Sequence, residues 1–544
     1  MTGPSRRILL GALFAAAASL GLRRPAFAQG APVRPGADKG GADKAVAEKP
    51  VAFGFEDVLK RARELSSREH SAVTTPLPEE LARLDFDRWR EIRFRADKAP
   101  LGEKGGKFRL QLFHPGHLFQ RSVTINLVTD GRSEPMANVA KLFDYGPIKF
   151  TKPLPPDLGV AGFRVHYPLN DPKRSDEFVS FLGASYFRWL GRDQKYGLSA
   201  RGLSIGTGLL NNNEEFPFFR EFWIETPIGE ANSITISALL DSPSLSGAYK
   251  FVFEPGPDSP VEVEATIFPR KTVERIGYAP LTSMYFLGEN DRHLNDRNKY
   301  DEFRPELHDS DGLLIHTNDG EWIWRPLHNP LVQEVHNFPV TNVRGYGLIQ
   351  RDRQFAHYQD IELNYEERPS YWIEPEDDWG EGRIELIELA TKDETFDNII
   401  VAFVPNEPAD AKSPFSFTYR MRSLTDGLKL HALGYTLNTF TAPAYALGAG
   451  ESVGRNTRRF MIDFTGGDLA FHLAKPSAVE IVASASNGKV FRQFLVPNPA
   501  AGGFRVMLDV EVHPTEVTTM TCKLRTGQRL LTETWAYSWK IYNF

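Results

Sequence analysis

From about residue 106 onward, most of the chain consists of short segments typical of β-strands separated by turns. Examples are KFRLQLFHPG (107–116), RSVTINLVTDG (121–131) and VEVEATIFPR (261–270), where apolar or β-branched residues recur between Gly, Pro or Asp. A strand that alternates apolar and polar residues buries one face only, so its sheet has to pack against another layer. The pattern therefore predicts a mainly β fold with large packed sheets.

The composition leaves room for a large core and more than one domain. The 544 residues are 41% hydrophobic, which exceeds the needs of one ordinary domain. Aromatic residues make up 12% of the chain, and such residues are enriched in strands. The formal net charge of −6 argues against a nucleic-acid partner, because that partner requires a basic face.

The first 28 residues have the pattern of an export signal. Arg6 and Arg7 precede an apolar run over 8–22, and a small-x-small cleavage site ends at Ala28. The run is shorter than the roughly 20 apolar residues that span a bilayer. The paired arginines indicate the twin-arginine route, so we expect a cleaved signal peptide and export to the periplasm. An uncleaved membrane anchor is the alternative.

Cleavage after Ala28 removes four arginines, which changes the formal net charge from −6 to −10. The single Cys522 excludes an internal disulfide and a Cys-rich metal site.

The rest of the chain divides by composition. Residues 29–50, rich in Gly, Ala, Lys and Pro, indicate a disordered tether. A second Pro- and Ala-rich stretch, 404–414, indicates a linker. We therefore expect an N-terminal β-sandwich over 51–403 and a C-terminal immunoglobulin-like sandwich over 415–544. Helical spacing predicts helices over 55–65 and 78–84, the second leading into a strand, and Asn318-Asp319-Gly320 predicts a hairpin.

Three motifs suggest chemistry that their surroundings do not support. GLSIG (202–206) fits the serine-hydrolase elbow, but no helical pattern follows it, so Ser204 is interpreted as a strand residue. DSDG (309–312) begins like a calcium loop, but Leu313 stands where an acid or Asn is required. The 13 His form no His-Glu-x-x-His motif, which argues against catalytic zinc. We expect no metal and no cofactor.

Carboxylates and aromatic residues gather in two stretches. The first holds His308, Asp309, Asp311, Trp322, Trp324 and Arg325, and the second holds Tyr358, Asp360, Tyr365, Arg368, Tyr371, Trp372, Glu374, Trp379 and Asp397. Aromatic faces stack on sugar rings, and two carboxyl groups suffice to hydrolyse a glycosidic bond. On residue types alone, a solvated sheet face with ordinary ion pairs explains the same clusters at least as well.

Long blocks in these regions carry a resemblance to a known family. They include FVSFLGASYFRWLG (178–191), EEFPFFREFWIE (214–225), APLTSMYFLGEN (279–290), FRPELHDSDGL (303–313), GLIQRDRQFAHYQD (347–360), RPSYWIEP (368–375) and ETFDNII (394–400). The chain resembles the periplasmic glucans biosynthesis protein G/D family. The resemblance implies a galactose-mutarotase-like N-terminal β-sandwich with a deep cleft, a small immunoglobulin-like C-terminal domain, and the β-1,2-glucan backbone as substrate.

The resemblance also implies roles for individual residues. Asp309 matches the family's general base, Asp397 matches its general acid, and Tyr365 matches a position close to the reacting sugar. An inverting endo-β-1,2-glucanase is expected, with a transglycosylase that cyclises or branches the glucan, or a non-catalytic glucan-binding factor, as alternatives. Substrate contacts are expected from His308, Asp311, Trp324, Arg325, Tyr358, Asp360, Tyr365, Arg368, Trp372, Glu374 and Trp379.

This mechanism sets requirements on the two acids. Asp397 has to be protonated near neutral pH, and the apolar neighbours Phe396 and Ile399 are expected to raise its pKa by desolvation. Asp309 has to remain ionised, supported by His308 or a nearby arginine. An inverting pair lies roughly 6.5–9.5 Å apart, and a wider gap requires a relay through water or a substrate hydroxyl.

The resemblance leaves the subtype open. The charged segment 287–303 is similar to the G type, whereas the twin-arginine signal is similar to the D type. Beyond the glucan, a functional link to an inner-membrane glucan synthase is expected, and the non-catalytic alternative would assist that synthase. The sequence does not decide between a monomer and a homodimer. A structural or partner-binding protein is a third interpretation, suggested only by the C-terminal part.

Overall fold

The structure is a computed structural model that describes residues 51–71, 77–156, 158–209, 214–292, 302–444 and 456–541. The predicted signal peptide (1–28), the predicted tether (29–50) and residues 293–301 of the charged segment lie outside these ranges. Among the described residues, no helix has both the length and the apolar character needed to cross a membrane.

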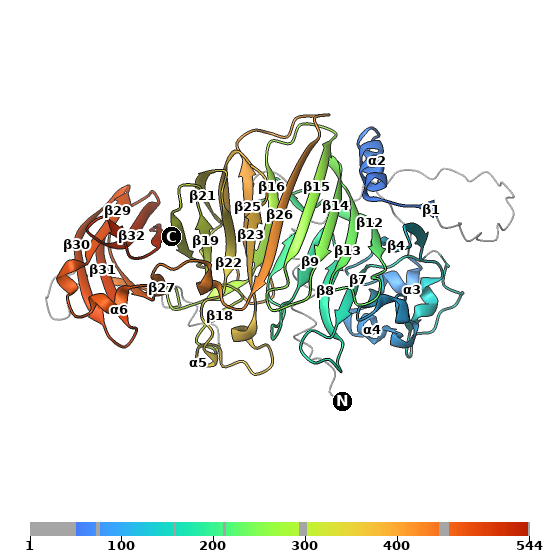
Figure 1. The fold of residues 1–544 in the computed structure, drawn as a ribbon, viewed down its shortest axis with the longest axis horizontal. Helices are drawn as coiled ribbons and strands as arrows, with labels where there is room; N and C mark the ends of the chain where they lie inside the picture. Colours follow the sequence, from blue (N-terminus) through green and yellow to red (C-terminus); the bar gives the residue numbers. More distant parts are fainter. Residues whose placement is uncertain are drawn as a thin grey trace.

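A 16-stranded sheet forms the longest layer of the fold and runs along the molecule (Figure 1). In spatial order its strands are β1 (Val51–Ala52), β5 (Arg132–Pro135), β4 (Thr124–Thr129), β12 (Phe218–Glu225), β13 (Ile234–Asp241), β14 (Leu245–Phe253), β15 (Val261–Pro269), β26 (Phe415–Leu424), β23 (Ser370–Pro375), β22 (Gly345–Ile349), β19 (Gly312–His316), β20 (Trp322–Pro326), β34 (Thr534–Trp539), β32 (Thr518–Thr526) and β29 (Glu480–Ser486), and β33 (Arg529–Leu530) pairs with β32.

A 10-stranded sheet packs against it. Its order is β21 (Glu334–Thr341), β24 (Glu381–Glu388), β25 (Ile399–Pro405), β16 (Ile276–Ser283), β10 (Ser199–Arg201), β9 (Tyr186–Trp189), β8 (Asp176–Leu182), β7 (Gly162–Tyr167) and β3 (Arg109–Phe113), and β11 (Leu203–Ile205) pairs with β16. Aromatic rings join the two sheets, since the Phe181 ring lies 5.4 Å from that of Phe251 and 5.3 Å from that of Phe222. The predicted mainly β architecture of large packed sheets is confirmed.

Smaller elements complete the fold. They are the pairs β17 (Tyr285–Leu287) with β18 (Leu307–His308) and β2 (Arg93–Phe94) with β6 (Phe143–Asp144), the helices α2 (Phe55–Ser66), α3 (Glu79–Ala82), α4 (Phe86–Glu91), α5 (Phe355–Tyr358) and α6 (Leu469–His472), and the 3₁₀ turns η1 (Ala96–Lys98), η2 (Gly102–Gly105), η3 (Val139–Leu142), η5 (Tyr365–Glu367), η6 (Gly427–Leu430) and η7 (Pro476–Ala478).

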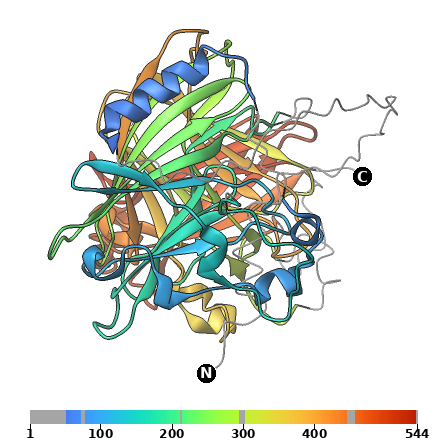
Figure 2. The same cartoon turned by 90° about the vertical axis from the view of Figure 1, so that its right-hand side faces the viewer.

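Helix α2 confirms the helix predicted over 55–65. Val58 and Ala62 are buried on its inner face, and Ser246 of β14 donates a hydrogen bond to the Ala62 carbonyl. The helix lies across the outer face of the large sheet (Figure 2). The second prediction is only partly right, because α3 is followed by α4 where a strand was expected. Asp85 caps α4 by accepting a hydrogen bond from the Arg88 amide, and such a cap favours a helix start.

The C-terminal part is a two-layer sandwich at one end of the molecule (Figure 1). One layer has the order β27 (Tyr435–Pro443), β28 (Thr457–Thr465), β31 (Gly503–Val512) and β30 (Gly488–Asn498). The other consists of β29, β32 and β34, and β34 pairs in parallel with β20, so the large sheet continues into the C-terminal layer.

The predicted domain boundary does not match this topology. Strand β26 begins at Phe415, but it pairs with β15 and β23 inside the large N-terminal sheet. The predicted linker 404–414 is anchored to the N-terminal sheets, because Val404 belongs to β25 and Ala409 bridges to Val273. The prediction was wrong because Pro and Ala mark both linkers and ordinary loops between strands.

Two other sequence predictions are confirmed. Strands β19 and β20 form an antiparallel hairpin around the turn at Asn318-Asp319-Gly320. Ser204 lies in the buried strand β11 and pairs with Gly277, so it does not sit on a strand-to-helix elbow.

The inter-sheet aromatic contacts generate a stability prediction. Phe181 is buried between the sheets, so Phe181→Ala is expected to lower the free energy of unfolding by about 3–5 kcal/mol. The control is Phe471→Ala in α6, whose side chain is 80% exposed and whose loss should change stability by about 0.5 kcal/mol or less. Thermal unfolding measures both, and equal melting temperatures for the two variants would contradict the proposed packing.

Candidate active site

Residues 282–285, which end β16 and begin β17, hold both candidate acids. The Asp309 amide donates a hydrogen bond to the Met284 carbonyl at 2.8 Å. The Asp397 carboxylate accepts one from the Thr282 hydroxyl at 3.2 Å. Two acids that are far apart in the sequence are therefore attached to residues only two positions apart.

The neighbours of each acid strengthen this attachment. Asn398 accepts a hydrogen bond from the Tyr285 amide at 2.8 Å and donates one to the Tyr285 carbonyl at 2.9 Å. The hydroxyls of Ser283 and Ser310 lie 2.7 Å apart. Because these groups are buried, the hydrogen bonds fix the backbone at both acids and pre-organise the site.

Asp309 has a cationic partner. Its side chain is nearly buried, and its Oδ1 accepts a hydrogen bond from Nη1 of Arg368. The Arg368 guanidinium lies 3.7 Å from the centre of the Tyr365 ring, a cation–π contact that holds the arginine in place. Arg368 is therefore the expected nearby arginine of Asp309, whereas His308 is bonded to Gln350 and Glu306.

Asp397 has the opposite environment. Burial raises its pKa to about 6, the positive charge of Arg188 acts against this shift, and the negative charge of Asp309 adds to it. Among its neighbours, Ile399 is fully buried in β25, whereas Phe396 is 39% exposed. About half of this carboxyl is therefore protonated at pH 6 and about a tenth at pH 7, far more than an ordinary aspartate keeps, which suits a general acid.

A network of charged groups continues from Tyr365. The Tyr365 hydroxyl donates to Glu394 at 2.9 Å, and Arg304 contacts Glu394 at 2.6 Å and Asp360 at 3.0 Å. Burial raises the pKa of Tyr365, so its phenol is neutral and acts as a donor. The network fixes the ring on which Arg368 rests.

Three other predicted residues form hydrogen bonds with residues 350–352, which follow β22. His308 is fully buried, with Nδ1 at 2.9 Å from Gln350 and Nε2 at 3.1 Å from Glu306. Asp311 accepts hydrogen bonds from the backbone amides of Arg351 and Asp352. The hydroxyl of the buried Tyr358 accepts one from the side chain of Gln350. These contacts support the Asp309 backbone.

The remaining predicted residues are packed elsewhere. Trp324 and Trp372 lie in the core beside the C-terminal sandwich, Trp379 packs in the main core, Arg325 pairs with Glu388 at 3.0 Å, and Glu374 pairs with Arg422 at 3.1 Å. The Trp324 ring is covered, because Arg351 lies 3.5 Å from its centre and a Cβ on Gly312 would come within 2.1 Å of it. These interactions give the five residues structural roles.

Four residues of the site were not identified from the sequence: Arg188, Thr282, Arg304 and Glu394. Arg188 is a charged residue in β9, where Tyr186, Phe187 and Trp189 are buried. A charge in such a strand indicates either a buried ion pair or a site, and this signal was available in the sequence.

Comparison with known proteins identifies the family. A family model described as "Periplasmic glucan biosynthesis protein, MdoG" matches residues 53–539. The chain belongs to this family. A relative named "Glucans biosynthesis protein G" from Ralstonia nicotianae is 44% identical over 490 residues, which cover 90% of this chain and 96% of that protein.

Other relatives carry both subtype names. "Glucans biosynthesis protein G" from Pseudomonas paraeruginosa is 41% identical, covering 89% of this chain and 92% of that one. "Probable glucans biosynthesis protein D" from Shewanella oneidensis is also 41% identical, covering 90% and 88%. Among solved structures, the GH36 alpha-galactosidase AgaB from Geobacillus stearothermophilus is 8% identical, and the match covers 48% of this chain and 38% of AgaB. Its TM-score of 0.25 is too low to bear on fold or activity.

The raised pKa of Asp397 generates a prediction about stability. Its folded-state pKa of about 6 exceeds the unfolded value of about 3.9, so the folded state resists loss of the proton. Ionisation of the buried Asp397 therefore destabilises the folded protein. This loss of stability is absent below about pH 4, grows as the pH rises and levels off above about pH 6. Asp397→Asn should therefore gain stability over the wild type between pH 4.5 and pH 7.5, by on the order of 2 kcal/mol.

Melting temperatures of both proteins at the two pH values measure this gain. Asp378→Asn, in an exposed loop, is the control and should follow the wild type at both. A difference between Asp397→Asn and the wild type that is the same at pH 4.5 and pH 7.5 would refute the raised pKa.

Proposed function

We propose that this protein is an inverting glycosidase that acts on the β-1,2-glucan backbone of osmoregulated periplasmic glucans, with Asp397 as general acid and Asp309 as general base. The observation that carries the proposal is the contrast between the two carboxyl groups: one is ion-paired and the other has its pKa raised to about 6, and both are attached to the segment 282–285. Two carboxyl groups whose environments differ in this way are typical of glycoside hydrolysis.

In the proposed reaction, Asp397 gives its proton to the glycosidic oxygen as the bond from that oxygen to the anomeric carbon breaks. A water molecule attacks the anomeric carbon from the opposite face and loses a proton to Asp309, directly or through a substrate hydroxyl. Arg368 engages Oδ1 of Asp309, which leaves Oδ2 to accept the proton. Tyr365 lies beside this pair and is proposed to contact the reacting sugar.

The same two acids support transfer as well as hydrolysis. If a hydroxyl of a glucan chain takes the place of water, the product is a cyclised or branched glucan. The predicted signal peptide, together with the family, supports action in the periplasm. A functional link to an inner-membrane glucan synthase is part of the proposal.

The first test is substitution of the acid. Asp397→Asn should lower the release of reducing ends from linear β-1,2-glucan by about 10²–10⁴-fold, the usual contribution of a general acid. Asp378→Asn is the matched surface control and should retain wild-type activity. Undiminished release by Asp397→Asn would remove this residue from the mechanism.

The wild-type protein also tests the activity itself. An α-anomeric product from the β bond is expected for inversion, and a cyclic product would indicate transfer. Unchanged glucan chain length after incubation with wild-type protein would instead favour a non-catalytic binding factor.

The environment of Asp397 predicts the pH dependence. Because the acid must be protonated, kcat/KM should fall above about pH 6. The positive charge of Arg188 lowers this pKa, so Arg188→Gln should shift the fall to higher pH. Arg192→Gln, at an exposed position nearby, should leave the profile unchanged. A shift to lower pH in Arg188→Gln would contradict the assignment of Asp397 as the acid.

A further inference from the structure

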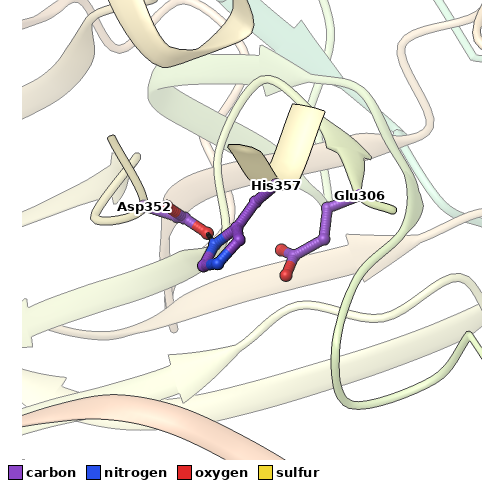
Figure 3. Close-up of side chains that lie close together, drawn as sticks. All are labelled: Glu306, Asp352 and His357. Carbon is purple, nitrogen blue, oxygen red and sulfur yellow. Dashed lines mark hydrogen bonds and ion pairs between the residues drawn. The ribbon is translucent and has the colours of Figure 1, made fainter. Parts of the chain in front are cut away.

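Three potential metal-ligating side chains meet outside the pair of acids. Glu306 precedes β18, Asp352 follows β22, and His357 lies in α5. Figure 3 shows the three side chains close together, and one ligand atom from each lies within 4.8 Å of the others. The Glu306 amide donates to the His357 carbonyl at 2.8 Å, so the two segments are joined at the site.

The spacing is close to what an ion requires. Two ligand atoms that are each about 2.1 Å from a metal lie at most about 4.2 Å apart. The ligand atoms of Glu306, Asp352 and His357 lie up to 4.8 Å apart, so side-chain movements of about half an ångström would bring them to metal-binding distance. Without an ion, a hydrogen bond joins His357 Nδ1 to Asp352, and metal binding would replace the shared proton.

The Asp311 carboxylate, which lines a cavity together with Asp352 and His357, gives an independent indication of a cation. Asp311 uses Oδ2 to accept hydrogen bonds from the Arg351 and Asp352 amides, both at 2.8 Å. Its Oδ1 is shielded from solvent and has no hydrogen-bond partner among the described residues. Such an oxygen is costly to bury unless a cation or a donor approaches it. Asp311, Asp352 and His357 line one cavity of about 200 Å³.

Further charged residues line this cavity. Glu289 also lines it. Two arginines are present at the wall, but Arg351 pairs with Glu533 at 2.7 Å and Arg353 donates to backbone carbonyls. Neither guanidinium therefore serves as the partner of the Asp352 or Asp311 carboxylate, whereas Glu306 has His308 at 3.1 Å.

We propose that Glu306, Asp352 and His357 bind a divalent transition-metal ion of the Zn²⁺ or Mn²⁺ class, with Asp311 beside it. A mixture of carboxylates and one imidazole suits these ions better than Mg²⁺, which prefers oxygen ligands alone. The cavity is smaller than the roughly 300–1,000 Å³ of typical organic-ligand sites, which favours an ion with water. The site is separate from the proposed glycosidase pair and does not depend on that function.

A second cluster of similar composition provides an internal control. His328, Glu334 and Glu388 also place ligand atoms within 4.8 Å of one another. There, however, Nη2 of Arg325 lies 3.0 Å from Glu388 and 3.1 Å from Nδ1 of His328. The guanidinium takes the position of a cation, so this cluster should not bind a metal.

Isothermal titration with ZnCl₂ and MnCl₂ tests the proposal on chelator-treated, tag-free protein. We expect one ion per chain, with affinity at least 10-fold weaker in His357→Gln and Asp352→Asn, and unchanged in the control His328→Gln. Binding that is equally strong in wild type and His357→Gln, or no binding by wild type, would overturn the proposal.

A measurement on the wild type alone avoids dependence on variants that fail to fold. Crystals soaked in ZnCl₂ should show an anomalous-scattering peak between Glu306, Asp352 and His357. A peak at the His328 cluster and none at this site would refute the assignment.

Discussion

The hydrogen bonds made by residues 282–285 are the constraint on which the candidate site depends. Thr282 holds the Asp397 side chain, and Met284 holds the Asp309 backbone. This short connection between two strands brings together loops that come from distant parts of the sequence. Because Thr282 belongs to the 10-stranded sheet and Tyr285 is buried, this shared segment fixes the two acids relative to each other.

The different environments of the two acids follow from what surrounds each of them. Asp309 meets the guanidinium of Arg368, which rests on the Tyr365 ring, so a positive charge is built into the fold next to it. Asp397 receives a neutral hydroxyl from Thr282, and its burial raises its pKa. An ion pair at one carboxyl group and burial of the other thus separate two identical side chains into a candidate base and a candidate acid.

The sequence predicted local features well and long-range ones poorly. Helix α2 and the β19–β20 hairpin depend on spacing and turn residues within a few positions, and both are confirmed. The domain boundary depends on which sheet β26 joins, and its alternating pattern suits either one. The expected sugar-stacking role of Trp324 was inferred from residue type, whereas its burial under Arg351 depends on a contact formed only in three dimensions. The pairing of Asp309 with Arg368 was likewise suggested as an arginine contact but could not be assigned without the fold.

The proposed metal site also could not be predicted from the sequence, because its residues meet only in the folded protein. Zinc motifs recognised in sequences place ligands a few residues apart on one element, whereas Glu306 lies far from Asp352 and His357 along the chain. The two histidine clusters have similar residue types, and they differ in whether an arginine occupies the centre. In the His328 cluster, Arg325 pairs with Glu388. Near the Glu306 cluster, Arg351 pairs with Glu533 instead. Because Glu533 comes from the C-terminal part, the docking of that part supplies the partner of Arg351, whereas the buried His308 lies 3.1 Å from Glu306 in that cluster.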